Sequence, residues 1–377
     1  MKVLQICAAY KPAYIYGGPT MSVSMLAEQL IKAGIQTEAY ATTANGKTEL
    51  TVTPNIPLTV DGVTVTYFKR LTKDHSHFSP ALLRQLWKQV KRFDVVHIHA
   101  WWNLVSLFSC IVALMRNVPV VVSPRGTLSP YSFHNKNIGF KWLIHHLLGK
   151  PLLKRCHIHA TSNQEAEAIG EIVKPKSIAN IPNFVRLPER SVEADRLPGV
   201  FRLIFLSRIE EKKGLDILLN ALPVLTFPYK LTIVGDGDIT YIETLTALAE
   251  KNGTAANIEW AGFRGDDKFK LLAENDLLVL PSYDENFGNV VIESLSEGTA
   301  VLLSRFVGLW DYVSDNKLGW ACELNAPAFA NLINFIQSAP DELNYIRTNA
   351  PGKIRTDFDE SHLVTEYAEL YKNIING

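Results

Sequence analysis

Residues 276–293 read Asp276-Leu-Leu-Val-Leu-Pro-Ser-Tyr-Asp-Glu-Asn-Phe-Gly-Asn-Val-Val-Ile-Glu293. The pattern predicts a strand that ends at Leu280, a polar loop, and a helix that begins near Gly288. The unpaired amides at such a helix start favour an anion such as a diphosphate. Glu285 and Glu293 would flank that anion, where carboxylates suit sugar hydroxyl groups better than phosphate. The alternative is a capped helix with two solvated acids.

A second loop of the same kind is Leu206-Ser-Arg-Ile-Glu-Glu-Lys-Lys-Gly214, which also follows a predicted strand and precedes a predicted helix. Its Arg208 offers a planar fork of donors and its Lys213 a point charge, and both suit a diphosphate. The alternative is a solvated basic turn.

A third loop contains Tyr16-Gly-Gly-Pro-Thr20 and follows the first predicted strand. Gly17 and Gly18 would let a ligand approach the backbone closely, and the helix after them again offers free amides. The pattern is not the G-x-G-x-x-G of nicotinamide-binding proteins. The alternative is a plain turn.

Short apolar strands alternate with helical patterns along all 377 residues. Unbroken apolar strands separated by helices indicate parallel sheets covered on both faces. The expected strands are Val3–Ala8, Val95–Ile98, Val118–Val122, His157–Ala160, Arg202–Ser207, Leu231–Val234, Ile258–Trp260, Leu277–Leu280 and Val301–Leu303. The expected helices are Thr20–Ala33, Leu215–Leu222, Tyr241–Lys251 and Ser361–Ile375. We therefore expect an α/β chain of two Rossmann-like, doubly wound domains that face each other across a ligand-binding cleft.

The predicted domain boundary is the segment 181–190, which reads Ile-Pro-Asn-Phe-Val-Arg-Leu-Pro-Glu-Arg. Its two prolines break any helix. We assign residues 1–185 to the first domain, residues 186–360 to the second, and residues 361–377 to a closing helix.

The composition excludes several classes of protein. Hydrophobic residues make up 47% and charged residues 20%, which is typical of a globular protein and not of a disordered, collagen-like or coiled-coil chain. The net charge is zero, so no nucleic-acid footprint is visible and no nucleic-acid partner is expected. Residues 1–185 hold 20 basic and 9 acidic residues, and residues 186–377 hold 18 and 29. The split indicates an acidic ligand or membrane surface for the first half, or two oppositely charged domains that attract each other.

The four cysteines, Cys7, Cys110, Cys156 and Cys322, are far apart and have no metal-ligand spacing. They are expected to be buried free thiols of a reducing compartment. The N-terminus is typical of a first strand and not of a signal peptide. The longest apolar run, Leu104–Met115, is too short to span a bilayer. We therefore expect a cytoplasmic protein.

The three loops, in this order, make the chain resemble the retaining glycosyltransferases of family 4, which have the two-domain GT-B fold. The resemblance covers the whole chain. The motifs that carry it are Gly17-Gly18, Val96-His-Ile-His99, Ile181-Pro-Asn183, Ser207-Arg-(x4)-Lys-Gly214, Asp276-Leu-Leu-Val-Leu-Pro-Ser282 and Glu285-(x7)-Glu293.

The resemblance implies a nucleotide-sugar donor bound mainly by the second domain. Apart from the resemblance, we expect UDP as the carrier because it is the commonest one. Arg208 and Lys213 would neutralise the departing diphosphate, Glu285 would hold the transferred sugar, and Glu293 would hold the ribose. Further donor contacts would come from Gly17, Gly18, Arg125, Gly235, Gly262, Phe263, Arg264, Asn286, Phe287, Gly288, Asn289 and Val290. The last helix would cross back onto the first domain.

The resemblance also implies a mechanism without a protein nucleophile, cofactor or metal ion. The acceptor hydroxyl would attack the face that the diphosphate leaves, through an oxocarbenium-like state, and the leaving oxygen would take the acceptor proton. Arg and Lys would replace a metal ion. Asp236-Gly-Asp238 has the spacing of a metal motif but lies where the family has a glycine-rich loop.

One position departs from the family pattern. Many relatives carry a histidine after the strand that is here Val118–Ser123, whereas this chain has Arg125 there. A guanidinium cannot act as a base at neutral pH, but it can hold a sugar hydroxyl or the acceptor. His99, His134 and Trp101 are the candidates for acceptor binding. Structural or surface histidines and a core tryptophan are the alternatives.

The segment Phe140–Arg155 mixes basic and apolar residues at helical spacing. The pattern is typical of a helix that lies on an anionic membrane surface, and also of a solvated face over a core. A membrane contact on the inner face would suit a lipid-linked acceptor.

The expected function is transfer of a sugar from a nucleotide donor to a sugar or lipid-linked oligosaccharide acceptor in surface-polysaccharide synthesis. One alternative is a nucleotide-sugar 2-epimerase of the same fold, which the Glu-x7-Glu context disfavours. The other is a non-catalytic two-domain binding protein, which would be expected to lose Glu285, Arg208 or Lys213.

Overall fold

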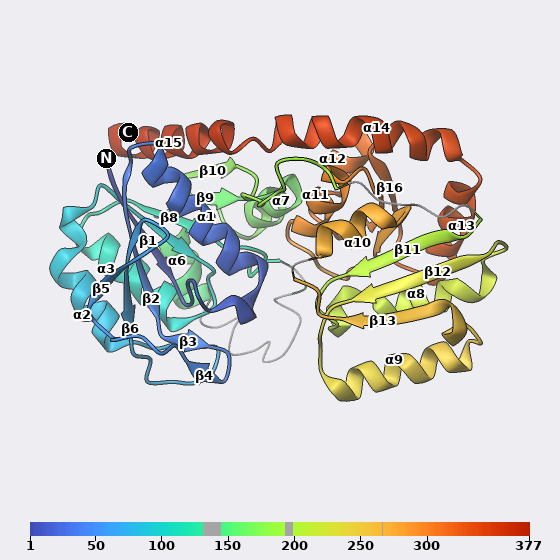
Figure 1. Cartoon of the computed structure of the whole chain (residues 1–377). Coiled ribbons are helices and arrows are strands. Elements are labelled where there is room, and N and C mark those ends of the chain that lie inside the picture. Colours follow the sequence, from blue (N-terminus) through green and yellow to red (C-terminus); the bar gives the residue numbers. More distant parts are fainter. Residues whose placement is uncertain (130, 132–144, 193–198, 266) are drawn as a thin grey trace. The chain divides into compact units, whose positions relative to one another are not determined.

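A computed structural model describes residues 1–129, 131, 145–192, 199–265 and 267–377. The chain forms two compact units, each with its own parallel sheet (Figure 1). Unit 1 comprises Met1–Phe184 and Glu360–Gly377, and unit 2 comprises Val185–Asp359. The expected α/β class with two parallel-sheet domains is confirmed.

Unit 1 is built on an eight-stranded sheet in the order β10-β9-β8-β7-β1-β2-β6-β5. All of its neighbouring strands run parallel except the edge pair β5 and β6. In the same order, the strands are Ser177–Asn180, His157–Ala160, Val120–Ser123, Val95–His99, Lys2–Cys7, Gln36–Thr42, Val63–Phe68 and Pro57–Val60. A small antiparallel pair, β3 (Ala44–Asn45) and β4 (Thr48–Glu49), lies outside this sheet.

Helices cover both faces of this sheet (Figure 1). Successive side chains of a strand point to opposite faces, so Val3 packs in one cluster and Leu4 in another. The described helical segments of unit 1 are η1 (Tyr14–Tyr16), α1 (Gly18–Lys32), α2 (Pro80–Gln89), η2 (Val90–Arg92), α3 (Leu104–Met115), the π-helical turn η3 (His145–Gly149), α6 (Lys150–Leu153), α7 (Asn163–Ile172) and α15 (Glu360–Asn376).

The last helix of the chain, α15, belongs to unit 1. Its Tyr367 and Tyr371 are buried in one cluster with Val3 of β1 and Met25 and Leu26 of α1. The C-terminal end of the chain is therefore part of the core of unit 1.

Unit 2 is built on a six-stranded parallel sheet in the order β13-β12-β11-β14-β15-β16. In this order the strands are Ile258–Gly262, Tyr229–Val234, Phe201–Leu206, Leu277–Leu280, Ala300–Ser304 and Gly319–Cys322. The described helical segments are η4 (Glu211–Lys213), α8 (Leu215–Ala221), η5 (Leu222–Val224), α9 (Ile239–Lys251), η6 (Ala255–Asn257), α10 (Lys268–Glu274), α11 (Asn289–Ser296), α12 (Trp310–Asp315), α13 (Ala326–Gln337) and α14 (Pro340–Asp357).

Two expectations about individual segments can be compared with the structure. All four cysteines are buried and free, as predicted. The apolar run Leu104–Met115 forms α3, which has 12 residues and is capped by the side chain of Asn103. No helix in the described ranges is both long and apolar enough to cross a membrane.

Candidate active site

The strand order of unit 2 reverses between β11 and β14. The loops that follow these two neighbouring strands therefore diverge from one point at the carboxyl edge of the sheet. Open α/β sheets bind ligands at such a point. The loop after β11 carries Arg208 and Lys213, and the loop after β14 carries Glu285. The fold thus brings the two loops predicted from sequence to the same edge.

These two loops are in direct backbone contact. Gly214 adopts the left-handed conformation, with φ of 67°, and a Cβ built there would lie 1.9 Å from the carbonyl oxygen of Pro281. Tyr283 also donates its backbone N–H to Lys212 O at 2.8 Å. A glycine is required at position 214 because any side chain would push the two loops apart.

Lys213 and Glu285 form an ion pair that joins the two loops. The Lys213 side chain is 9% exposed and that of Glu285 20% exposed. Burial alone would raise the pKa of Glu285, but Lys213, together with Lys212 and Arg208, holds that pKa below its ordinary value. Glu285 is therefore a carboxylate at neutral pH, in a positive environment. An acceptor-only carboxylate of this kind can bind sugar hydroxyl groups.

Arg208 is the most exposed of the three predicted catalytic residues. Its side chain is 57% exposed and its Nη1 lies 2.7 Å from Glu210 Oε1. Such an exposed pair contributes little to stability, so the guanidinium is free to exchange Glu210 for an anionic ligand. Lys212, which lies 3.6 Å from Asp284, adds a further positive charge to the same edge.

The helix after Glu285 is α11, and Gly288 is its N-cap residue, with φ of 92°. As a glycine, Gly288 provides no capping side chain to this helix end. Phe287 is buried in the core of unit 2, so it can offer a ligand only its backbone. Asn286 and Asn289 are half-buried in the same segment.

Glu293, the second predicted carboxylate, lies inside α11 and is not part of the Lys213 pair. Its Oε1 accepts a hydrogen bond from Lys268 Nζ of α10 at 2.7 Å. The Glu293 side chain is only 12% exposed. A ligand hydroxyl that bonds to Glu293 would therefore share it with Lys268.

The four predicted donor contacts around β12 and β13 fall into two groups. Gly235 donates its N–H to Gly262 O at 2.9 Å. A Cβ on Gly235 would lie 1.9 Å from Ser207 O. Gly235 therefore allows close backbone contact between the segments that follow β11, β12 and β13. Phe263 is 72% exposed and Arg264 lies 3.2 Å from Asp267. An exposed aromatic ring can stack on a nucleotide base.

The Asp-Gly-Asp sequence at residues 236–238 has a structural role. Asp238 caps α9, because its Oδ1 accepts hydrogen bonds from the backbone of Thr240 at 3.0 Å and of Tyr241 at 3.2 Å. Within the described ranges, no group of three or more potential metal ligands is found.

In unit 1, Gly17 and Gly18 lie at the start of α1, after the loop that follows β1 and contains η1. Gly17 has φ of 65° and no heavy atom lies within 4 Å of a Cβ built on it. It is the N-cap residue of α1 and provides no capping side chain. The preceding Tyr16 accepts a hydrogen bond on its hydroxyl from Gly46 N at 3.0 Å, which ties this loop to the β3–β4 turn.

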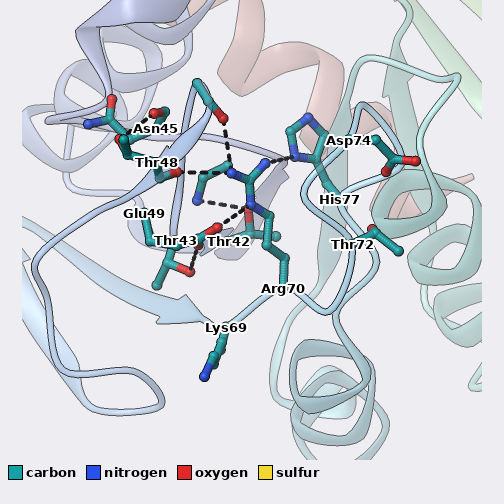
Figure 2. Close-up of polar contacts among 12 residues, drawn as sticks. Thr42, Thr43, Asn45, Thr48, Glu49, Lys69, Arg70, Thr72, Asp74 and His77 are labelled. Carbon is teal, nitrogen blue, oxygen red and sulfur yellow. Dashed lines mark hydrogen bonds and ion pairs between the residues drawn. The ribbon is translucent and has the colours of Figure 1, made fainter.

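Arg70 organises the same edge of unit 1 and was not predicted from the sequence. Figure 2 shows its guanidinium at the centre of a cluster of polar residues. Nε lies 2.6 Å from Glu49, Nη1 lies 3.3 Å from His77 Nδ1, and Nη2 donates to Gly46 O and Thr48 O at 3.0 and 2.9 Å. Burial and the charge of Arg70 lower the pKa of His77 to about 4, so this histidine is a neutral acceptor.

The two described acceptor candidates, His99 and Trp101, lie at the carboxyl end of β7. His99 is 2% exposed and Trp101 is 1% exposed, so neither side chain presents a free face. Trp101 packs in the core, whereas Trp102 donates to Thr127 O at 2.6 Å. His134 lies outside the described residues.

Arg125 has left-handed backbone geometry, with φ of 53°. Its Nε donates to His99 Nδ1 at 3.3 Å and its Nη1 donates to Asn183 Oδ1 at 2.8 Å. The geometry fixes this half-buried cation against two neutral acceptors.

The predicted membrane segment Phe140–Arg155 is described only in part, because residues 140–144 lie outside the described residues. In the rest, Leu147 is 65% and Leu148 is 46% exposed, whereas Leu153 is buried. Exposed leucines next to Lys150, Lys154 and Arg155 give this part of unit 1 a mixed apolar and basic surface.

Comparisons with known proteins identify the family of this chain. Residues 16–188 match the family model Glycosyltransferase Family 4, and residues 193–353 match the model Glycosyl transferases group 1. The uncharacterized glycosyltransferase MJ1607 of Methanocaldococcus jannaschii is 25% identical, over 99% of this chain and 98% of its own length. The lipopolysaccharide core biosynthesis glycosyltransferase LpsE of Rhizobium meliloti is 30% identical, over 45% of this chain and 51% of its own.

The fold also matches solved structures. HepE of Anabaena, crystallised with UDP and glucose, superposes with a TM-score of 0.74 at 19% identity, over 99% of this chain and 100% of its own. The ranges matched by the two family models, one in each half, together cover most of the sequence, and the motifs described above lie within these ranges. The chain is therefore a glycosyltransferase with the GT-B fold and belongs to glycosyltransferase family 4.

Proposed function

We propose that this enzyme transfers a sugar from a UDP-sugar to a sugar acceptor, with retention of the anomeric configuration and without a metal ion. The observation that carries the proposal is the Lys213–Glu285 ion pair at the strand-order reversal of unit 2, with Arg208 close enough to lower the pKa of the same carboxyl. Two cations beside a carboxylate suit a substrate that carries both a diphosphate and hydroxyl groups.

Each residue has a separate role in this proposal. Lys213 and Arg208 bind the diphosphate and stabilise the charge that develops as it leaves. Removing one such electrostatic contact typically lowers the rate about 10²–10³-fold. Glu285 binds hydroxyl groups of the transferred sugar, and Glu293 binds the ribose.

The remaining proposed donor contacts surround these four residues. The backbone at the start of α11, from Asn286 to Val290, binds the donor, because a helix N-terminus favours an anion. The other contacts come from Gly17, Gly18, Arg125, Gly235, Gly262, Phe263 and Arg264.

The proposed reaction balances without a protein nucleophile. The bond between the sugar anomeric carbon and the diphosphate oxygen breaks, and the acceptor oxygen bonds to the same carbon on the same face. The acceptor proton passes to the departing diphosphate oxygen. Lys213 and Arg208 stabilise the negative charge on that oxygen until it takes the proton. No cofactor enters this sequence, because the nucleotide sugar is itself a substrate.

The relatives support our proposals that the donor is a UDP-sugar and that the reaction belongs to surface-polysaccharide synthesis. The crystals of HepE contain UDP and glucose, and LpsE is named for lipopolysaccharide core biosynthesis. We extend both to this chain: the donor is a UDP-sugar, and the acceptor is a surface-polysaccharide precursor, including a lipid-linked oligosaccharide.

The test is a thermal-stability screen in EDTA with UDP, GDP, ADP and dTDP, followed by transfer assays with sugars on the diphosphate that binds. A ligand present at about 100 times its Kd adds roughly 2.7 kcal/mol of stability. We expect UDP to raise the Tm by a few degrees, and the product to keep the donor's anomeric configuration by NMR. No shift with any of the four, or an inverted product, would contradict the proposal.

We also propose that unit 1 touches an anionic membrane through the surface around Leu147 and Leu148. Exposed apolar residues next to Lys150, Lys154 and Arg155 support this contact. The full-length protein should float with vesicles that contain anionic lipid at low salt, and Leu147→Ser with Leu148→Ser should reduce the bound fraction. Equal flotation of both proteins, or none of either, would contradict the contact.

A further inference from the structure

A row of hydrogen-bonded side chains runs through unit 1 from Arg125 to the backbone carbonyl of Ile181. It joins residues of β1, β7, β8, β9 and α15. In order, its members are Arg125, His99, Gln5, Tyr371, His97, Ser123, His159 and Ile181 O. All the side chains between the two ends are buried.

At the first end of the row, Arg125 determines which atom donates and which accepts in each hydrogen bond. A guanidinium carries donors and no acceptor. His99 Nδ1, at 3.3 Å from Arg125 Nε, must therefore be unprotonated, which places the proton of His99 on Nε2. That N–H points at Gln5 Oε1, 2.6 Å away, and the amide nitrogen of Gln5 then donates to the hydroxyl of Tyr371 at 3.4 Å.

At the other end, the carbonyl oxygen of Ile181 determines the donors and acceptors independently. A carbonyl oxygen only accepts, so His159 donates from Nε2 at 2.8 Å and accepts on Nδ1 from the Ser123 hydroxyl at 2.6 Å. Ser123 then accepts from His97 Nε2 at 2.6 Å, and His97 Nδ1 accepts from the Tyr371 hydroxyl at 2.7 Å. The two derivations meet at Tyr371 and agree, so every link has one donor and one acceptor.

The three histidines of the row are neutral. Burial, with smaller contributions from neighbouring groups, holds the pKa values of His97 and His99 well below the ordinary range and lowers that of His159 to about 3. Tyr367, which also contacts His159 Nε2 at 3.0 Å, is uncharged as well, because burial raises its pKa. Arg125 is thus the one permanent charge among the members of the row.

No acidic side chain in the described part of the chain forms an ion pair with Arg125. Its Nε and Nη1 bond to the neutral His99 and Asn183, and its Nη2 has no hydrogen-bond partner among the described residues. The left-handed backbone at position 125 is disfavoured by roughly 1–2 kcal/mol for a residue with a Cβ. An unpaired, half-buried cation in a disfavoured conformation is typical of a ligand site.

We infer that Arg125 binds an anionic oxygen of the nucleotide sugar, and that the hydrogen-bonded row, which includes Tyr371 of the C-terminal helix, holds its guanidinium in place for that contact. The inference rests on the proposed function. The shared chemistry is an oxyanion, which can belong to the diphosphate or to a carboxylate on the transferred sugar. Arg125 is the binding residue, and His99, Gln5 and Tyr371 are positioning residues.

The row itself is tested by NMR on the full chain labelled with nitrogen-15 histidine. We expect His97, His99 and His159 all to carry their proton on Nε2 and not to titrate between about pH 6 and 8. Tyr371→Phe removes the donor to His97 Nδ1, so His97 should no longer hold one tautomer. Tyr40→Phe, a buried tyrosine of unit 1 outside the row, is the control and should change none of them. A proton on Nδ1 of any of the three in the wild type would overturn the row.

The ligand contact is tested by calorimetric titration of UDP, UDP-glucose and UDP-glucuronate. Arg125→Gln should lower affinity about 10- to 100-fold, since it removes a charge-assisted hydrogen bond. An equal loss for all three ligands assigns the oxyanion to the diphosphate, and a loss confined to UDP-glucuronate assigns it to a sugar carboxylate. Unchanged affinity for all three overturns the inference.

Two further variants distinguish a failure of this inference from a failure of the proposed function. Tyr371→Phe should weaken binding by itself but add nothing to Arg125→Gln, because it acts only through Arg125. Additive losses would show a merely structural effect and overturn the positioning role. Lys213→Ala should abolish binding in the same titrations. If the wild type binds nothing, the proposed function fails and this inference with it. If Lys213→Ala abolishes binding and Arg125→Gln does not change it, only this inference fails.

Discussion

Lys213 and Glu285 are 72 residues apart in the chain and form one nearly buried ion pair. Each lies in the loop after a strand, and those strands, β11 and β14, are neighbours at the point where the strand order reverses. The pair therefore links the fold of unit 2 to its proposed chemistry. It also makes each partner a structural residue for the other.

Lys213→Ala should lower the transfer rate by at least about 100-fold, because it removes a contact to the departing diphosphate. It also leaves Glu285 without its principal partner, which for a buried pair typically lowers the free energy of unfolding by about 3–5 kcal/mol. Kinetic assays and urea denaturation measure the two effects. Lys230→Ala is the control, because Lys230 pairs with Glu259 on the exposed surface of the same unit. Wild-type turnover in Lys213→Ala would contradict the site assignment.

The pair should make stability depend on pH in the acid range. The folded pKa of Glu285 is lower than its ordinary value of 4.5. A group of this kind stabilises the fold above its unfolded pKa, and the stabilisation is lost as the pH falls through the folded pKa. The Tm of the wild type should therefore drop below about pH 4.5 more steeply than that of Glu285→Gln. Parallel Tm curves for the two proteins would show that the pair makes no pH-dependent contribution.

Gly214→Ala should destabilise unit 2 and weaken nucleotide binding, because the new Cβ would lie 1.9 Å from Pro281 O. Gly253→Ala is a matched control: its φ of 68° is almost the same as the 67° of Gly214, but no heavy atom lies within 4 Å of its Cβ. Both variants should lose the roughly 1–2 kcal/mol of a left-handed alanine, and only Gly214→Ala should lose more. Equal Tm values for the two would refute the close approach of the loops.

Arg70→Lys should loosen the β3–β4 turn and the loop that carries Gly17, although the charge is kept. An ammonium group cannot reproduce the fork that reaches Glu49, His77 and two carbonyl oxygens. We expect faster amide hydrogen exchange at residues 44–49 and a lower Tm. Arg84→Lys, on the exposed side of α2, is the control. Unchanged exchange in Arg70→Lys would show that the cluster does not hold the turn.

Glu293→Ala should raise the donor KM about tenfold and leave kcat nearly unchanged, because a ribose contact is made equally in the ground and transition states. Steady-state kinetics with varied donor concentration measures both constants. A fall in kcat with an unchanged KM would move Glu293 from donor binding to the chemical step.

The elements that were predicted from sequence are those with unbroken apolar strands. Strand β14 is apolar and buried along its whole length, and β7 and β11 each contain an apolar run with few polar residues, so hydrophobicity marks all three. Strands β2 (Gln36–Thr42) and β6 (Val63–Phe68) were missed, because threonines and a glutamate alternate with their apolar residues. A search for continuous apolar runs does not detect strands in which polar residues alternate with apolar ones.

Some residues of the candidate sites could be predicted from the sequence, and others could not. Arg208, Lys213 and Glu285 could be predicted to meet, because the ends of parallel strands converge at one edge. The row behind Arg125 could not be predicted, because it depends on strand register: Gln5 lies opposite His97, and His99 opposite Ser123. The available signal was a polar residue within each apolar strand. Arg70 gave no signal, since its partners come from the β3–β4 hairpin and from His77, which are separated from each other in the sequence.

The most direct test of the central claim is a calorimetric titration of UDP, GDP, ADP and dTDP into wild type and Lys213→Ala, with EDTA present. We expect the wild type to bind UDP without a metal ion, and Lys213→Ala to lose this binding while remaining folded by circular dichroism. Wild-type binding of UDP that persists unchanged in folded Lys213→Ala would contradict it.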